Sequence, residues 1–179
     1  MSIILKKTLV AALITIGMAS TAQAADGGHG KITFKGSILD AACSISQTSD
    51  EQTVQLGQVS KAALQNGGKS NPTNFSINLE NCMIDGDNAK NKVQVTFTGK
   101  ESTADNGLLG ISGSASGASV AITDAAGALI KLGSPTKPQE LQNGKATLNF
   151  AAYLQGNGGT SAVTEGDFTT VADFTLAYN

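Results

Sequence analysis

Apolar and polar residues alternate in several short runs, and this period of two constrains the fold more than any other feature of the chain. Clear examples occupy residues 75–80, 93–98, 148–154 and 168–178. Gly, Asn and Asp residues that favour turns separate these runs. Seven or so short strands of this kind predict an all-β sandwich.

Smaller elements are expected between the long runs. Residues 53–56 alternate and predict a short second strand, and residues 57–64 predict one or two helical turns capped by Ser60. The pair Asn143-Gly144 is a typical hairpin signal before the run at 148–154. Residues 85–88 carry two aspartates, but the spacing does not fit a calcium loop, so a turn is expected there.

Residues 1–24 have the pattern of a secretory signal peptide. Two lysines precede an apolar run, and Ala22-Gln23-Ala24 suits cleavage before Ala25. The apolar run is too short to span a membrane comfortably, and no second run of about 20 apolar residues follows, so no transmembrane helix is expected. The mature protein would then be a single domain within the 155 residues from Ala25 to Asn179.

The charge of the chain argues against nucleic acid as a partner. The mature part has 10 lysines, no arginine and 14 acidic residues, which gives a formal charge of −4. Recognition of phosphates and bases depends on arginine clusters and basic stripes. The same composition argues against a polybasic membrane-binding surface.

Residues 31–38 alternate in a way that allows two interpretations. Ile32, Phe34, Gly36 and Ile38 share one face, and glycine in a strand often marks the close approach of another backbone or side chain. The segment is either the first strand of the protein's own core or a strand built to be buried in another molecule. Residues 25–30, with three glycines, read as a flexible lead into it.

The other end of the chain also reads as an edge. The last run, residues 168–179, continues to the final residue and has no successor to pair with. An open edge at each terminus favours pairing between molecules.

The two cysteines, Cys43 and Cys82, suggest one disulfide in an oxidising compartment, with a free thiol pair or a metal pair as the alternatives. The single histidine, His29, lies in the flexible lead, so no zinc site or histidine-based catalytic triad is expected. Glycine-rich segments lack the spacing of a phosphate-binding loop. Paired carboxylates of the glycosidase type are not located by any pattern.

Several segments together resemble the major pilins of chaperone–usher fimbriae, the family of the type 1 and P pilus rod subunits. The match is carried by Gly30 to Ile45, by Val54-Gln-Leu-Gly-Gln58, by Leu79-Glu-Asn-Cys82, and by the C-terminal strand. That strand has a penultimate Tyr178 and a glycine, Gly166, fourteenth from the end. Each segment alone is weak, but their joint order and spacing is specific.

The resemblance implies an incomplete immunoglobulin-like β-sandwich that is completed by a donated strand. Residues 25–40 would be the N-terminal donor extension, and residues 41–179 would be the pilin domain. The pocket-filling residues of the donor strand would be Ile32, Phe34, Gly36 and Ile38, and Cys43 and Cys82 would form the family's disulfide. The groove-edge strand that binds the chaperone would carry Gly166, Phe168, Phe174, Leu176, Tyr178 and Asn179.

The implied function is that of a structural major subunit of a fimbria, a homopolymer built from identical or related pilins by donor-strand exchange. A periplasmic chaperone and an outer-membrane usher would be further partners, with export through the periplasm to the cell surface. No enzymatic activity, cofactor, metal site, nucleic acid or direct membrane insertion is expected. The alternatives are a minor adaptor pilin of the same system and a monomeric secreted carbohydrate-binding β-sandwich.

Overall fold

The computed structural model of the chain describes residues 28–85, 90–104, 107–159 and 162–179. The predicted signal peptide lies outside the described residues, and so does most of the predicted turn at 85–88. The chain divides into two units, residues 1–38 and 39–179.

In the first unit, the described residues 28–38 contain no helix or strand, and every one of them is exposed. The alternating segment at 31–38 is therefore not a strand of a folded core in this structure. Even so, its alternation places large apolar side chains on one face of the segment, where they are exposed to water, which is unfavourable.

The second unit is built from antiparallel strands with two short helices and one 3₁₀ turn. The strands are β1 (Ser44–Ile45), β2 (Thr73–Cys82), β3 (Lys92–Gly99), β4 (Leu109–Gly110), β5 (Ser112–Gly113), β6 (Ala118–Asp124), β7 (Leu129–Ile130), β8 (Gln139–Glu140), β9 (Gly144–Gly156), β10 (Phe168–Thr169) and β11 (Ala172–Tyr178). The helices are α1 (Gln47–Asp50) and α2 (Lys61–Leu64), and α2 continues into the 3₁₀ turn η1 (Gln65–Gly67).

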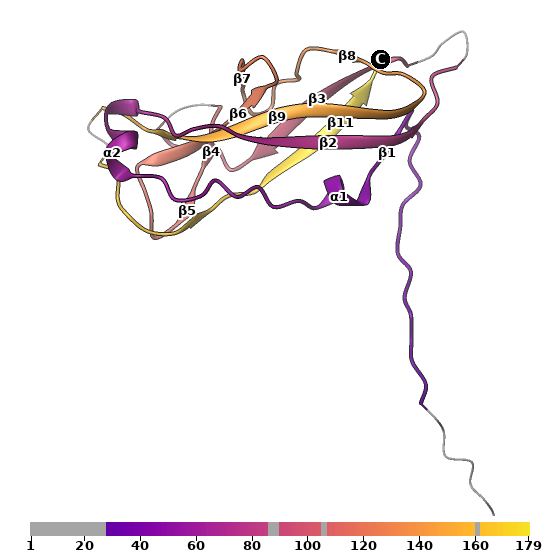
Figure 1. Cartoon of the computed structure of the whole chain (residues 1–179), viewed down its shortest axis with the longest axis horizontal. Helices are drawn as coiled ribbons and strands as arrows, with labels where there is room; N and C mark the ends of the chain where they lie inside the picture. The colour runs from indigo at the N-terminus through magenta and orange to yellow at the C-terminus, as the bar shows by residue number, and fades with distance from the viewer. Residues whose placement is uncertain (1–27, 86–89, 105–106, 160–161) are drawn as a thin grey trace, which may run out of the picture. The chain divides into compact units, whose positions relative to one another are not determined.

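Two sheets face each other, as Figure 1 shows for the long strands. The larger sheet has the order β1-β2-β9-β6-β4, with β7 added to β6. The second sheet has the order β11-β3-β8, and β10 forms a small separate pair with β5. This architecture is the all-β sandwich that the sequence predicts.

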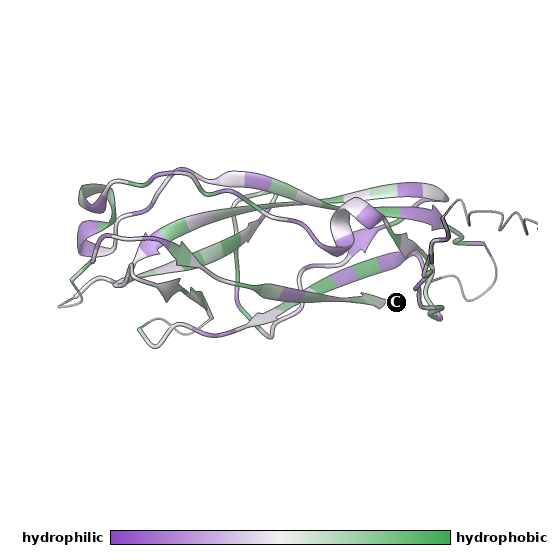
Figure 2. Ribbon diagram, turned by 90° about the horizontal axis from the view of Figure 1, so that it is seen from below, coloured by the Kyte–Doolittle hydropathy of each residue, from purple (hydrophilic) through white to green (hydrophobic). Residues whose placement is uncertain are grey.

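The core lies between the two sheets and comes from the alternation of the strands. Hydrophobic and hydrophilic residues follow one another along the strands in Figure 2, up to the strand that ends at the C-terminus. Phe97 of β3 and Phe150 of β9 pack edge to face with ring centroids 5.1 Å apart, and Phe75 of β2 joins them at 5.6 Å from Phe150. Such aromatic contacts add to the stabilisation that burial provides.

The disulfide between Cys43 and Cys82 joins the start of the domain to the end of β2. The resemblance implied this pairing, and the structure contains it. A hydrogen bond also joins α1 to β2: the buried Ser49 hydroxyl accepts a hydrogen bond of 2.9 Å from the Asn78 backbone N–H.

The predicted helical turn is present as α2. The Ser60 side chain accepts a hydrogen bond of 3.3 Å from the Ala62 N–H, as a helix cap does. The end of α2 packs tightly on the end of β9, because a Cβ added at Gly156 would overlap the carbonyl oxygen of Leu64.

Three local expectations differ from the structure. Residues 53–56 form no strand, and the hairpin expected at Asn143-Gly144 is absent, because β8 pairs with β3 while β9 pairs with β2 and β6. The C-terminal run is divided into β10 and β11, which pair with different strands.

Candidate strand-docking groove

The last strand, β11, has a partner on one edge only. It pairs along its whole length with β3, from Ala172 opposite Gly99 to Tyr178 opposite Val93. Beyond its end, Asn179 and Lys92 exchange two backbone hydrogen bonds of 2.9 and 3.0 Å. Because antiparallel partners alternate between bonded and non-bonded pairs, the odd-numbered residues of β11 bond to β3 and the even-numbered residues point their N–H and C=O groups the other way.

The same parity holds in β10. The Asp167 carbonyl accepts backbone hydrogen bonds of 3.0 and 3.1 Å from Ser114 and Ala115, next to the pairing of β10 with β5. Asp167, an odd-numbered residue, thus bonds to the segment next to β5. Phe168 therefore presents its N–H and C=O groups to the opposite edge. Among the described residues no strand pairs with that edge. The backbone N–H and C=O groups of the even-numbered residues from 168 to 178 are therefore open to pairing with a further strand.

Residues 53–59 form the facing margin. Val54, Leu56 and Val59 are half-buried, while their neighbours are exposed, and Leu56 and Val59 pack against the core. Within the described part of the chain, no backbone hydrogen bond joins this stretch to another segment. It has the burial pattern of a strand but lacks the partner that would make it one.

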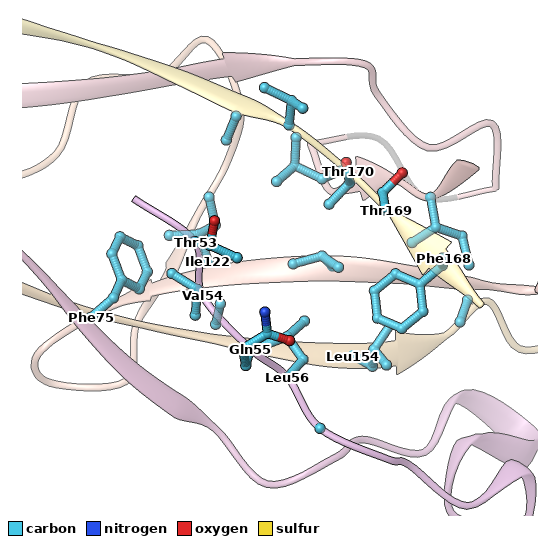
Figure 3. Close-up of a pocket in the computed structure, with 18 of the residues that line it drawn as sticks. Thr53, Val54, Gln55, Leu56, Phe75, Ile122, Leu154, Phe168, Thr169 and Thr170 are labelled. Carbon is cyan, nitrogen blue, oxygen red and sulfur yellow. The ribbon is translucent and has the colours of Figure 1, made fainter. Parts of the chain in front are cut away.

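Between the two margins lies a groove of about 1380 Å³. Figure 3 shows Val54 and Leu56 on one side of it, Phe168 on the other, and Ile122 and Leu154 on the strands behind. Most of the large side chains in the lining are apolar, and several belong to the core cluster of the sandwich. The groove is therefore a long opening into the core with two unpaired backbone margins.

One end of the groove is crossed by an ion pair. Lys61 of α2 lies 3.6 Å from Glu165, which precedes β10, and both residues line the groove. Their side chains are 46% and 80% exposed, so solvent screens this pair and it contributes little to stability.

The predicted groove-edge residues fall on one continuous margin. Phe168, Phe174, Leu176 and Tyr178 are half-buried and pack against the core, with their neighbours exposed. Phe168 and Phe174 line the groove directly, as does Gly166, which has a φ of +146°. A Cβ at Gly166 would overlap the Ser114 hydroxyl, so a side chain does not fit there.

Tyr178 and Asn179 hold the end of this margin in place. The Tyr178 hydroxyl donates a hydrogen bond of 3.5 Å to the carbonyl of Cys43, and burial raises the pKa of Tyr178. The Asn179 side chain donates to the Gln94 side-chain oxygen at 2.8 Å.

The predicted donor residues are exposed. Ile32, Phe34 and Ile38 are 78%, 89% and 103% exposed, and a Cβ at Gly36 would meet no atom within 4 Å. Exposed large apolar side chains that are repeated on one face of a segment are typical of a surface that is buried in an assembly.

The sequence alone does not identify residues 53–59 as the second margin. The run Val54 to Gln58 is part of the family resemblance, and its alternation predicts an ordinary strand. No group of three or more His, Cys, Asp or Glu side chains that could hold a metal occurs among the described residues. No helix in those residues is both long and apolar enough to cross a membrane.

These features define a class of protein: an immunoglobulin-like sandwich with an open groove along its last strand. Residues 32–179 match the family model described as "Fimbrial protein", and the chain belongs to this family. It is a structural subunit of a bacterial surface fimbria.

Curated relatives and solved structures are similar over nearly the whole chain. The Fimbria A protein of Serratia marcescens is 56% identical, over 97% of this chain and 98% of that protein. The Major MR/P fimbria protein of Proteus mirabilis is 51% identical, over 97% of each chain. A chain in the structure of a chaperone–usher pilus superimposes with a TM-score of 0.75 at 36% identity, covering 86% of this chain and 97% of that one. By its similarity to these relatives, the chain is a major fimbrial subunit.

Proposed function

We propose that this subunit polymerises by strand donation, in which residues 25–40 of one copy fill the groove of the next. The observation that carries the proposal is the match between two parts of one chain. One part is a groove with an open backbone edge and apolar core side chains in its interior, and the other is an exposed segment with alternating large apolar side chains.

The dimensions of the two parts agree. The open margin from Phe168 to Tyr178 would extend about 36 Å at roughly 3.3 Å per residue, and residues 31–38 would extend about 26 Å. The segment is thus short enough to lie within the groove and long enough to pair along most of it.

The energetics favour docking. Burial of Ile32, Phe34 and Ile38 from their exposed state contributes about 1.5 to 3 kcal/mol each, or about 5 to 9 kcal/mol before the cost of ordering the segment. The ladder hydrogen bonds add to this, because the open edge of β11 gains backbone partners along its length.

The open groove also requires protection before assembly. An exposed ladder edge beside a hydrophobic groove promotes aggregation. We propose that a periplasmic chaperone covers the groove by pairing with residues 168–179. An outer-membrane usher then exchanges this strand for the next subunit's segment. Residues 1–24 direct export through the periplasm, and the fimbria forms at the cell surface.

The protein is proposed to act without catalysis. The groove has core side chains in its interior and two backbone margins, and the role that follows from these features is strand binding. No cofactor is proposed.

Polymer formation by variants of the mature chain tests the proposal. Ile32→Asn with Phe34→Asn places polar amides on the apolar face of the donor segment and should abolish polymers. Thr33→Asn with Ser37→Asn is the matched control, since it adds the same groups to the polar face without changing its charge and should retain polymers. Equal polymer yields from the two variants would show that the apolar face is not what docks.

A further inference from the structure

The open margin carries charges on the face that points away from the core. From 167 to 179 the odd-numbered residues are exposed, and Asp167 and Asp173 are the acidic members of this outer row. Both line the groove, and neither forms an ion pair with any described residue. A strand that pairs with this margin places its own polar face beside these two carboxylates.

The central stretch of the donor segment, residues 31–38, has the opposite charge. Lys31 and Lys35 lie on its polar face, and the two acidic residues of the extension, Asp26 and Asp40, lie outside this stretch. A strand added to a sheet keeps its alternation in phase with its neighbour, because its apolar side chains must face the core. The two lysines would therefore lie in the same row as Asp167 and Asp173.

We infer that these groups fix one register: an antiparallel donor strand from a second copy, with Lys31 directly opposite Asp173 and Gly36 opposite Phe168. This inference rests on the proposed function. In this register Lys35 lies opposite Thr169 and diagonal to Asp167, which is within reach of a long side chain. Both lysines thus have an acidic partner at the same time.

The inward side chains support the same register. The four inward pairs are Ile32 with Ala172, Phe34 with Thr170, Gly36 with Phe168, and Ile38 with Gly166. Each pair combines a large side chain with a smaller one or with none, which allows the strands to approach without overlap. Gly36 is then required because the Phe168 ring occupies the space beside it.

Other alignments fail on size or charge. A shift by two residues in one direction keeps both charge contacts, but it sets the two large rings of Phe34 and Phe168 against each other and leaves Gly36 opposite Gly166. A shift in the other direction places Ile32 opposite Phe174, and it leaves both lysines beside Asp173 alone. Parallel alignments that bring the lysines to both aspartates set Ile38 against Phe174 or Leu176.

The alternation of hydrogen-bonded and non-hydrogen-bonded pairs allows the register to be tested by cross-linking. The even-numbered residues of the margin offer their N–H and C=O groups to the donor, so the even pairs are hydrogen-bonded and Lys31 with Asp173 is a non-hydrogen-bonded pair. Such pairs have Cα atoms about 4.5 Å apart with side chains close together. This separation lies within the range that a disulfide spans.

The test uses full-length chains assembled into fimbriae. A chain with Lys31→Cys and Asp173→Cys should form a covalent head-to-tail ladder, seen after denaturation without reductant. The matched control, Thr33→Cys with Asp173→Cys, is shifted by two residues and should form far less. A stronger ladder from the control would overturn the register, and so would fimbriae that contain no ladder from either variant. A cross-link confined to single chains would contradict donation by a second copy.

Charge exchange provides an independent test that needs no cysteine. Lys31→Asp alone and Asp173→Lys alone should each slow polymer formation by about two- to fivefold, the range of one cross-strand charge pair. The double variant should recover to within about twofold of the unchanged protein, since its charges are again opposite. A double variant as slow as the slower single variant would overturn the register while leaving strand donation intact. Absence of polymers from the unchanged chain would instead overturn the proposed function.

Discussion

Asn179 and Lys92 exchange two backbone hydrogen bonds at the end of the chain, with N···O distances of 2.9 and 3.0 Å. This pair sets the parity of the whole last strand, because bonded positions recur at every second residue. Phe174, Leu176 and Tyr178 consequently point their backbone N–H and C=O groups toward the open edge, while their side chains pack against the core. One strand can therefore supply apolar packing and an open ladder together.

Enlargement of Gly36 should block assembly. Gly36→Leu adds a side chain where the inferred register places Phe168, and overpacking of this kind costs about 1 to 3 kcal/mol. We expect this subunit to bind a chaperone and to fail to enter fimbriae, as measured by shear and sedimentation of surface fimbriae. Ser37→Leu is the matched control on the polar face. Normal fimbriae from Gly36→Leu would refute the requirement for a small residue.

Removal of the disulfide should destabilise the domain. Cys43 and Cys82 are separated by 39 positions, and closing a loop of this length contributes about 3 to 4 kcal/mol in the loop-entropy model. Replacement of both residues by serine should lower the free energy of unfolding of the mature protein by this amount in denaturant titrations. A loss below about 1 kcal/mol would contradict the loop-entropy account.

Ionisation of Tyr178 should lower the stability of the folded domain at high pH. Burial raises the pKa of this hydroxyl above its value in the unfolded chain, which is about 10. The folded state therefore holds the proton more tightly, and the stabilisation is complete below about pH 10 and is lost as the pH rises through the folded pKa. Unfolding free energies measured between about pH 9 and pH 12 should fall more steeply for the unchanged protein than for Tyr178→Phe. Parallel curves would show that this hydroxyl does not contribute.

Gly156 should tolerate no side chain. A Cβ there would overlap the Leu64 carbonyl oxygen, which belongs to the backbone and cannot rotate away. Gly156→Ala should destabilise the domain by about 2 kcal/mol or more, measured as a lower midpoint of thermal unfolding. Gly30→Ala is the comparison, since a Cβ at Gly30 meets nothing within 4 Å, and its midpoint should not change.

The sequence predicted the fold class and the position of the long strands, because alternation alone determines which face is buried. β3 and β11 lie where alternation indicated, and the burial of β11 alternates residue by residue. The prediction of a hairpin at Asn143 was wrong because this residue makes tertiary contacts instead. The Asn143 side chain accepts a hydrogen bond of 2.6 Å from Ile84 and donates one of 2.9 Å to Asp85, so it ties two loops together.

Residues 53–56 and 31–38 differ from the prediction in another way. Both have the alternation of strands, and neither is paired in the structure of one chain. A strand needs a backbone partner as well as a pattern. In the proposed assembly each of these segments gains its partner from another copy of the chain, which the structure of one molecule does not contain.

Hydrogen exchange in assembled fimbriae tests the central claim most directly. The amides of Asp173, Thr175 and Ala177 face β3 and serve as the internal control. The account predicts that the amides of Phe168, Ala172 and Phe174, which lie opposite residues 30–36 of the donor in the inferred register, are protected to a similar degree, together with that of Phe34 in the donor segment. Slow exchange at the odd-numbered positions with free exchange at the even-numbered ones would show that the edge stays open in the fimbria, and would contradict strand donation.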